Sequence, residues 1–136
     1  MIEVQTGRAG ELMACGIIEA MGYRTVLCQQ RNFDAMIWID DRSYRVEIKT
    51  ATAPRMHNGK RRYEFSTATG SRKKVPIDPR QTDILCLLAL DLRRCYFIAA
   101  YKQTTTRLNL LPVKMVGYSE AEQLAVAIAL VDERRL

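Results

Sequence analysis

Three charged residues stand near the open end of a predicted β-hairpin in the segment DAMIWIDDRSYRVEIKT, residues 34–50. Asp34 opens the first strand, and Glu47 and Lys49 lie near the end of the second strand. Two converging carboxylates offer the hard oxygen ligands that Mg²⁺ prefers. A neighbouring lysine can hold a water molecule or stabilise negative charge as a phosphorus atom is attacked. These residue types therefore suit metal-assisted phosphodiester cleavage, provided that the hairpin brings them to one face.

The length of the turn decides whether the side chains share a face. Side chains alternate along a strand, so an even turn puts Asp34 on the face of Glu47 and Lys49, and an odd turn does not. A turn centred in the polar DDRS segment predicts that Asp34 lies opposite Lys49. It likewise places Met36 opposite Glu47. The alternative is an ordinary Asp–Lys pair on a solvated sheet face, which would add only a few tenths of a kcal/mol.

Length and composition indicate one folded domain. The chain has 136 residues, which fits a single domain spanning 1–136. Hydrophobic residues make up 48% and charged residues 26%, so we expect a packed core rather than disorder. No apolar run of about 18 residues occurs, and no membrane association is expected. Glu3 and Glu11 interrupt the N-terminal segment, which therefore does not read as a secretory signal.

The cysteines and the single histidine narrow the chemistry further. Cys15, Cys28, Cys86 and Cys95 contain no C-x₂-C pair, so a zinc site is not indicated. We expect reduced, mostly buried thiols and a cytoplasmic location. His57 is the only histidine, which argues against a Ser–His–Asp or Cys–His mechanism.

The charge distribution favours a polyanionic partner. Net charge is +6 with a pI near 9.4, and Lys and Arg dominate residues 55–80, where Glu64 and Asp78 are the only acids. Phosphate groups bind Lys and Arg with release of counterions. The alternative is a solvated basic loop. The candidate nucleic-acid contacts are Arg55, Lys60, Arg61, Arg62, Arg72, Lys73 and Lys74.

Two helices are predicted, one near each end of the chain. Apolar residues at helical spacing predict a first helix over 7–21, with Thr6 as N-cap and Gly22 as the stop. Ser119 and Glu122 form a capping box before a final apolar run.

Strands fill the sequence between these helices. The apolar run 82–90 suits a central strand that is buried on both faces. Helices and strands together predict a mixed α/β fold. Further strands are expected at 24–30, within the hairpin 33–50, near 62–67, at 95–101 and at the edge segment 105–110.

Asp34, twelve intervening residues and the EIK triplet at 47–49 resemble the PD-(D/E)XK nuclease superfamily. The order also fits: a helix with the Gly10–Glu11 pair, a strand, a strand opening with Asp, and a strand ending in E-x-K. The segments VEIKTATAPRMHNGKRRYEFSTA and DILCLLALDLRRCYFIAA are similar to small nucleases related to group I intron-associated homing endonucleases. Archaeal Holliday-junction resolvases share this layout. The likeness covers about residues 6–101 and implies a restriction-endonuclease-like αβββ(α)β core with a mixed sheet and flanking helices.

The resemblance also implies roles for individual residues. Asp34 and Glu47 would ligate Mg²⁺, for which Mn²⁺ substitutes, with the backbone carbonyl of Ile48 as a third ligand. Lys49 would position or activate the attacking water. Glu11 would complete the site as in resolvase-like members, and its alternative is a solvent-exposed helical glutamate.

The sequence departs from the family pattern at two points. Phe33 stands before the aspartate where the motif has proline. The core helix expected between the third and fourth strands looks very short.

The sequence thus predicts an Mg²⁺-dependent DNA endonuclease that cleaves duplex DNA as a homodimer or homotetramer. Three alternatives remain: a junction resolvase on the same fold, a nuclease-fold DNA-binding protein without catalysis, and a small basic interaction domain.

Overall fold

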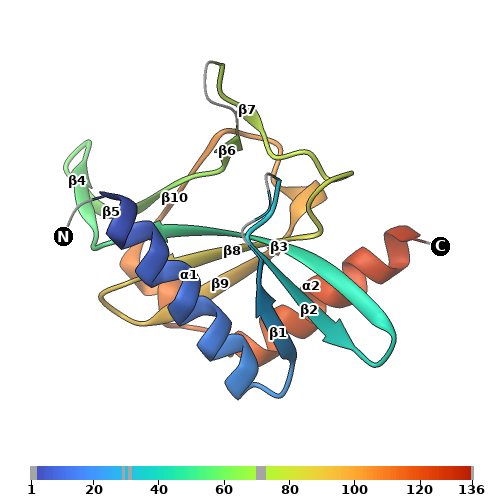
Figure 1. The fold of residues 1–136 in the computed structure, drawn as a ribbon. Helices are drawn as coiled ribbons and strands as arrows, with labels where there is room; N and C mark the ends of the chain where they lie inside the picture. The colour runs from blue at the N-terminus through green and yellow to red at the C-terminus, as the bar shows by residue number, and fades with distance from the viewer. Residues whose placement is uncertain (1–2, 29, 31, 70–72, 136) are drawn as a thin grey trace.

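The computed structural model describes residues 3–28, 30, 32–69 and 73–135 and has a mixed α/β architecture with a mixed sheet, as predicted (Figure 1). The main elements are α1 (Glu3–Ala20), β1 (Arg24–Leu27), β2 (Ala35–Ile39), β3 (Arg42–Ala51), β8 (Ile84–Ala89), β9 (Arg94–Ala99) and α2 (Glu120–Arg135). The smaller elements are β4 (Arg55–His57), β5 (Lys60–Ser66), β6 (Ala68–Thr69), β7 (Val75–Pro76), β10 (Arg107–Leu110) and the 3-10 helices η1 (Ala100–Lys102) and η2 (Pro112–Met115).

The main sheet has the strand order β1-β2-β3-β8-β9. Strands β3 and β8 run parallel, and the other neighbours in this sheet are antiparallel. Every residue of β8 is buried, which confirms the central strand predicted from the apolar run 82–90. Its neighbour β3 carries the E-x-K triplet, so this triplet lies on a strand inside the sheet.

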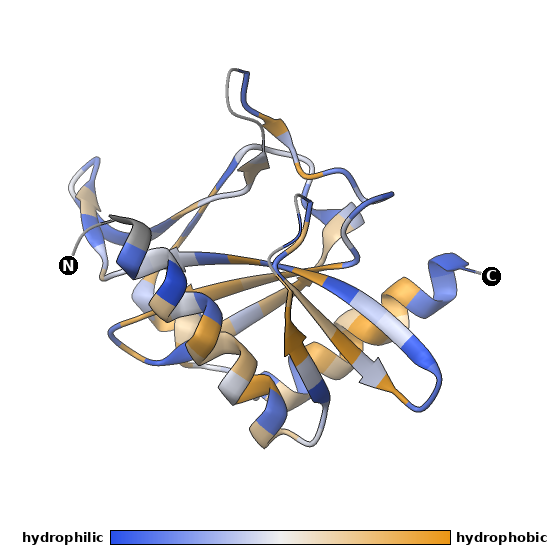
Figure 2. Cartoon of the chain, in the orientation of Figure 1, coloured by the Kyte–Doolittle hydropathy of each residue, from blue (hydrophilic) through white to orange (hydrophobic). Residues whose placement is uncertain are grey.

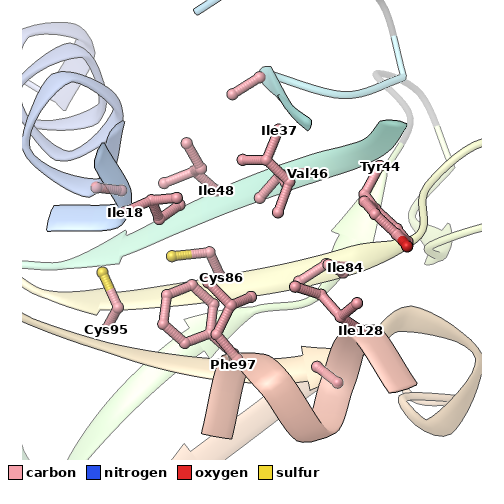
Figure 3. Packing of buried hydrophobic residues seen from close by; sticks show 14 of the residues in the cluster. Ile18, Ile37, Tyr44, Val46, Ile48, Ile84, Cys86, Cys95, Phe97 and Ile128 are labelled. Carbon is pink, nitrogen blue, oxygen red and sulfur yellow. The ribbon is translucent and has the colours of Figure 1, made fainter. Parts of the chain in front are cut away.

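Both helices cover the same face of this sheet. Ile18 from α1 and Ile128 from α2 pack into one core with Ile48, Cys86 and Phe97 from three neighbouring strands (Figure 3). The central strands are mainly apolar, whereas the β2–β3 turn and the C-terminal end of α2 are hydrophilic (Figure 2). The hydrophobic effect therefore fixes the helices against the sheet from one side.

The opposite face of the main sheet is covered by a second, smaller sheet. Its strand order is β10-β5-β4. Tyr63 and Phe65 of β5 form a second core with Leu85 and Leu87 of β8 and with Met115 of η2. Strand β8 is thus enclosed between two apolar cores, which explains its unbroken run of apolar residues.

The predicted ends of the first helix are half right. Helix α1 begins at Glu3, so Thr6 lies inside the helix and does not cap it. Gly22 ends the helix as predicted: its φ of +100° is in the left-handed region, and its amide donates to the carbonyl of Glu19 at 2.9 Å. At the other end of the chain, the amide of Glu122 donates to Ser119 Oγ at 3.2 Å, as a capping box requires.

The connection between β3 and β8 differs most from the arrangement that the sequence resemblance implies. Its described residues form strands β4 to β7. Strand β5 confirms the strand expected near 62–67, whereas the very short core helix that the resemblance implies is not found among the described residues of this connection. The segment treated as a basic loop holds a tight hairpin, in which Asn58 and Gly59 have φ values of 50° and 79°. An Asn-Gly pair with two positive φ values is typical of a type I′ turn. Strand β1 is also shorter than predicted and ends at Leu27.

At Gly10, helix α1 approaches the main sheet closely. A Cβ atom at this position would lie 1.9 Å from Thr50 Oγ1 and 2.9 Å from Thr50 Cβ. Only glycine fits, because real Cβ atoms do not approach other heavy atoms below 3.0 Å. The close approach brings the next residue, Glu11, over the end of β3.

Gly10→Ala is expected to destabilise the protein by about 1–3 kcal/mol, because the added methyl group overpacks the contact with Thr50. Gly16→Ala on the same helix meets open space and is the matched control. It should stabilise the fold by roughly 0.5–1 kcal/mol through helix propensity. Thermal unfolding followed by circular dichroism measures both changes. An equal rise in Tm for the two variants would contradict the close packing at Gly10.

Candidate active site

The β2–β3 hairpin has an even turn, but the turn is one residue earlier than predicted. Ile39 pairs with Arg42, so Asp40 and Asp41 form a two-residue turn, and Asp40 has a φ of 56°. Met36 consequently lies opposite Arg45 and not opposite Glu47. The shift moves every pair by two residues and leaves each side chain on its predicted face.

Asp34 lies in the bend just before β2, and extending the corrected register by one position places it nearest to Glu47 and not to Lys49. Ala35 pairs with Val46, and Asp34 comes one position before Ala35. The Asp34 amide donates to the Val46 carbonyl at 2.8 Å, and Asp34 Oδ2 accepts a hydrogen bond from the Ile48 amide at 2.7 Å. Backbone contacts to β3 therefore fix both the main chain and the carboxylate of Asp34.

Glu47 is a half-buried carboxylate in a crowded negative environment. Its side chain is 16% exposed. Burial is the main cause that raises the pKa of Glu47 to about 8, and the nearby charge of Asp34 raises it further. Lys49 opposes both effects without cancelling them. Lys49 alone thus does not offset the crowding of the two carboxylates, and a divalent cation could supply further positive charge.

Lys49 completes the set from the same strand face. Its Nζ atom lies 3.5 Å from Glu47 Oε1 and donates to the carbonyl of Ala68 at 3.1 Å. Ala68 belongs to β6, so a short strand outside the main sheet holds the lysine in place. The ammonium group is a fixed positive charge beside the carboxylate pair.

The other two predicted site residues border the same cleft. Glu11 reaches it from α1, and Ile48 reaches it from β3. In a strand, the N–H and C=O of one residue leave on the same edge. Since the Ile48 amide points to Asp34, the Ile48 carbonyl also opens on the Asp34 side. The role of Glu11 stays a prediction.

Within the described ranges, no group of three or more His, Cys, Asp or Glu side chains converges as a metal cage would. Asp34 and Glu47 are the two carboxylates that the structure brings into contact at the start of the cleft-lining part of β3. This number suits Mg²⁺, which usually keeps several waters and binds through one or two carboxylates.

A cleft of about 1180 Å³ surrounds these residues. It lies between the N-terminal half of α1, the second half of β3, the small sheet and the β6–β7 segment. Arg55 and Lys74, two predicted nucleic-acid contacts, line it. Arg107 and Glu64 also line it and were missed. The signal for Arg107 was its place in the predicted edge segment 105–110, but the sequence does not show which strand that segment joins.

The remaining predicted contacts lie outside this lining. Lys60 and Arg61 are exposed on the β4–β5 hairpin, and Lys73 is exposed beside the cleft residue Lys74. Arg62 is half-buried on β5. Arg72 lies outside the described residues.

A second, smaller cavity of about 230 Å³ borders Asp83 and the end of α2. Burial alone would raise the pKa of Asp83, but hydrogen bonds and charge from Arg45, with help from Arg135, hold it below its usual range. Asp83 Oδ1 accepts from Arg45 Nη2 at 3.1 Å. Asp83 is paired with both Arg45 and Arg135, so this cavity borders a structural ion-pair cluster.

No protein-family model and no curated protein matches this chain. Among solved structures, it is similar to a bacterial homing endonuclease, I-Ssp6803I, with a TM-score of 0.76 and 15% sequence identity. The match covers 98% of this chain and 99% of that chain. The two proteins therefore share a fold over nearly their whole lengths. None of the helices in the described chain is long and apolar enough to span a membrane.

The raised pKa of Glu47 predicts a pH-dependent stability. An unfolded glutamate ionises near its ordinary value of 4.5, whereas folded Glu47 ionises at about 8. The stability that protonated Glu47 contributes is fully present below pH 4.5. It is lost as the pH rises from 4.5 to about 8. Glu47→Gln should therefore gain Tm relative to wild type between these pH values and hold that gain above them.

Thermal melts from about pH 5 to about pH 9 without divalent cations measure this difference. Glu133→Gln, at an exposed position of α2, controls for the general loss of a negative charge. Melting curves of Glu47→Gln that stay parallel to wild type across this range would refute the buried, charge-crowded state of Glu47.

Proposed function

We propose that this protein is a metal-dependent endonuclease of the PD-(D/E)XK type that hydrolyses phosphodiester bonds in duplex DNA. The observation that carries the proposal is the half-buried Asp34–Glu47 pair, with Lys49 at 3.5 Å from Glu47, in a cleft lined by basic residues. The fold that it shares with a bacterial homing endonuclease supports the same class of activity.

Mg²⁺, or Mn²⁺ in its place, would be held by Asp34, Glu47 and the carbonyl of Ile48. These hard oxygen donors fit the ion, and its charge would offset the crowding that raises the pKa of Glu47. When bound, the ion supplies Lewis acidity to a phosphate oxygen and lowers the pKa of a bound water.

The residues of the chain perform the remaining tasks. Lys49, tethered to Ala68, would position the attacking water and stabilise the negative charge that develops on the phosphate. Water attacks phosphorus and the bond to the 3′-oxygen breaks, which leaves a 5′-phosphate. Arg55, Lys74 and Arg107 give the cleft a positive lining that would attract DNA. Lys74 would hold the phosphate backbone, because such contacts fix register and orientation.

Duplex cleavage also needs a second active site. The two strands of DNA run in opposite directions, so two clefts related by symmetry would cut both strands. We therefore propose that the protein acts on DNA as a homodimer or homotetramer.

The nuclease activity predicts defined losses in two variants. Asp34→Asn and Lys49→Met should each reduce Mg²⁺-dependent nicking of plasmid DNA by at least about 100-fold, because each removes a group that acts at the phosphate. Asp41→Asn in the β2–β3 turn and Lys114→Met on η2 are the matched controls and should keep wild-type rates. Gel assays of nicked and linear product measure the rates.

The substrate panel contains linear duplex, supercoiled plasmid and four-way-junction DNA, each with Mg²⁺ and with Mn²⁺. If only the four-way junction is cleaved, the protein is a junction resolvase and not a duplex endonuclease. No cleavage of any substrate by the wild-type protein would defeat the catalytic assignment.

The basic residues of the β6–β7 segment predict the salt dependence of DNA binding. Neutralising Lys73 and Lys74 together should reduce the slope of log K against log salt by up to about 0.9 for each phosphate that the variant no longer neutralises. Lys114→Ala removes an equally exposed lysine away from the cleft and should leave the slope unchanged. Fluorescence anisotropy with duplex DNA over a range of salt concentrations measures the slope. An unchanged slope in the double variant would show that Lys73 and Lys74 do not contact phosphate groups in the complex.

A further inference from the structure

The small sheet β10-β5-β4 presents one entirely polar face. Side chains directly opposite each other in a sheet share a face, and alternate residues along a strand share it too. The pairs Arg55–Arg62, Asn109–Glu64 and Arg107–Ser66 therefore lie on the same face. This polar face, which we define by these residues, borders the cleft through Arg55, Glu64, Ser66 and Arg107.

The opposite face of the same strands anchors them. Tyr63 and Phe65 are buried, and Leu108 and Leu110 pack against the same core. The polar face is therefore held on a rigid support, which is a requirement for a surface that must present side chains at fixed spacing.

The small sheet is narrow along its length. Strand β5 pairs with β4 through Lys60–Arg62 and with β10 through Tyr63–Ser66. Each paired stretch is thus two strands wide, and the N-terminal half of α1 lies across the cleft from it. The major groove of B-DNA is about 12 Å wide and admits a two-stranded β-ribbon. Alternate residues of a strand are about 6.8 Å apart, which matches two base-pair steps of about 3.4 Å.

Two polar atoms of this face have no partner in the described protein. Arg62 Nε and Asn109 Oδ1 are buried from solvent and form no hydrogen bond there. Buried polar atoms are nearly always paired, and leaving one unpaired destabilises a fold. Neither atom would lose a protein hydrogen bond if its side chain turned outward to a ligand that supplies a partner, as base edges do.

We propose that the polar face of the small sheet enters the major groove of duplex DNA and reads base sequence there, an inference that rests on the DNA binding in the proposed function. Arginine forms two hydrogen bonds to guanine, asparagine to adenine, and glutamate accepts from cytosine. Arg55 and Arg107 would read guanine, Asn109 adenine and Glu64 cytosine. Arg55 thereby moves from the predicted phosphate contacts to base recognition.

Selection of bound sequences from a randomised duplex library, without divalent cations, tests this assignment on the full chain. The wild-type protein should enrich a defined motif. Arg107→Lys keeps the charge but loses the bidentate hydrogen bonding of the guanidinium group. It should therefore lower the preference for the bound base over the other bases at one or two adjacent positions by about tenfold or more. Binding to unrelated duplex should stay unchanged.

Matched variants separate base reading from charge and from folding. Arg61→Lys alters an exposed arginine on the opposite face and should preserve the whole motif. Asn109→Ala should reduce the base preference at a different position of the motif from Arg107→Lys. Circular dichroism melts show whether each variant is folded. A motif that is identical in the wild type and in both polar-face variants would overturn the proposal, as would the absence of any motif.

The two proposals fail in different ways. If the wild-type protein cuts DNA but enriches no motif, the base-reading proposal is refuted and the nuclease proposal is supported. If the variants change the motif as expected but the wild-type protein cuts no substrate, the base-reading proposal is supported and the nuclease proposal is refuted.

Discussion

The candidate site depends on one constraint: two carboxylates are held against each other at the open end of a hairpin. Burial and the nearby charge of Asp34 both disfavour the charged form of Glu47 and raise its pKa to about 8. The arrangement persists because its backbone belongs to the most enclosed part of the fold. Val46 and Ile48, on either side of Glu47, are buried in the core, and β3 pairs with the fully buried β8. Core packing thus offsets the local repulsion.

Contacts remote from the cleft maintain the same geometry. Thr82 Oγ1 donates to the carbonyl of Asn32 at 2.7 Å, which holds the segment that leads to Asp34. The amide of Asp83 donates to the Arg45 carbonyl at 3.0 Å, and Asp83 Oδ2 accepts from the Arg45 amide at 2.7 Å. These bonds align the start of β8 with β3. The ion-pair cluster at Asp83 is therefore structural support for the site two residues further along β3.

Sequence periodicity could predict the shared face of Asp34 and Glu47, because face depends only on whether the turn is even or odd. It could not predict the register, since Asp40–Asp41 and Asp41–Arg42 are both acceptable two-residue turns. The Asn58–Gly59 pair does carry a hairpin signal in the sequence, and its basic neighbours obscured it. Neither the pairing of β10 with β5 nor the cleft position of Arg107 was predictable, because both depend on long-range strand pairing.

The connection between β3 and β8 joins these features into one design. Parallel neighbours require a crossover, and a helix is the usual solution. In this protein, strands β4 to β7 occupy the crossover. Successive side chains of a strand point to opposite faces of the sheet, whereas neighbouring side chains on one face of a helix are three or four residues apart. Phe65 can therefore cover the sheet while the next residues on either side, Glu64 and Ser66, face the cleft. Substitutions on the inner face should act on stability and those on the outer face on recognition, so recognition can change without disturbing the core beneath it.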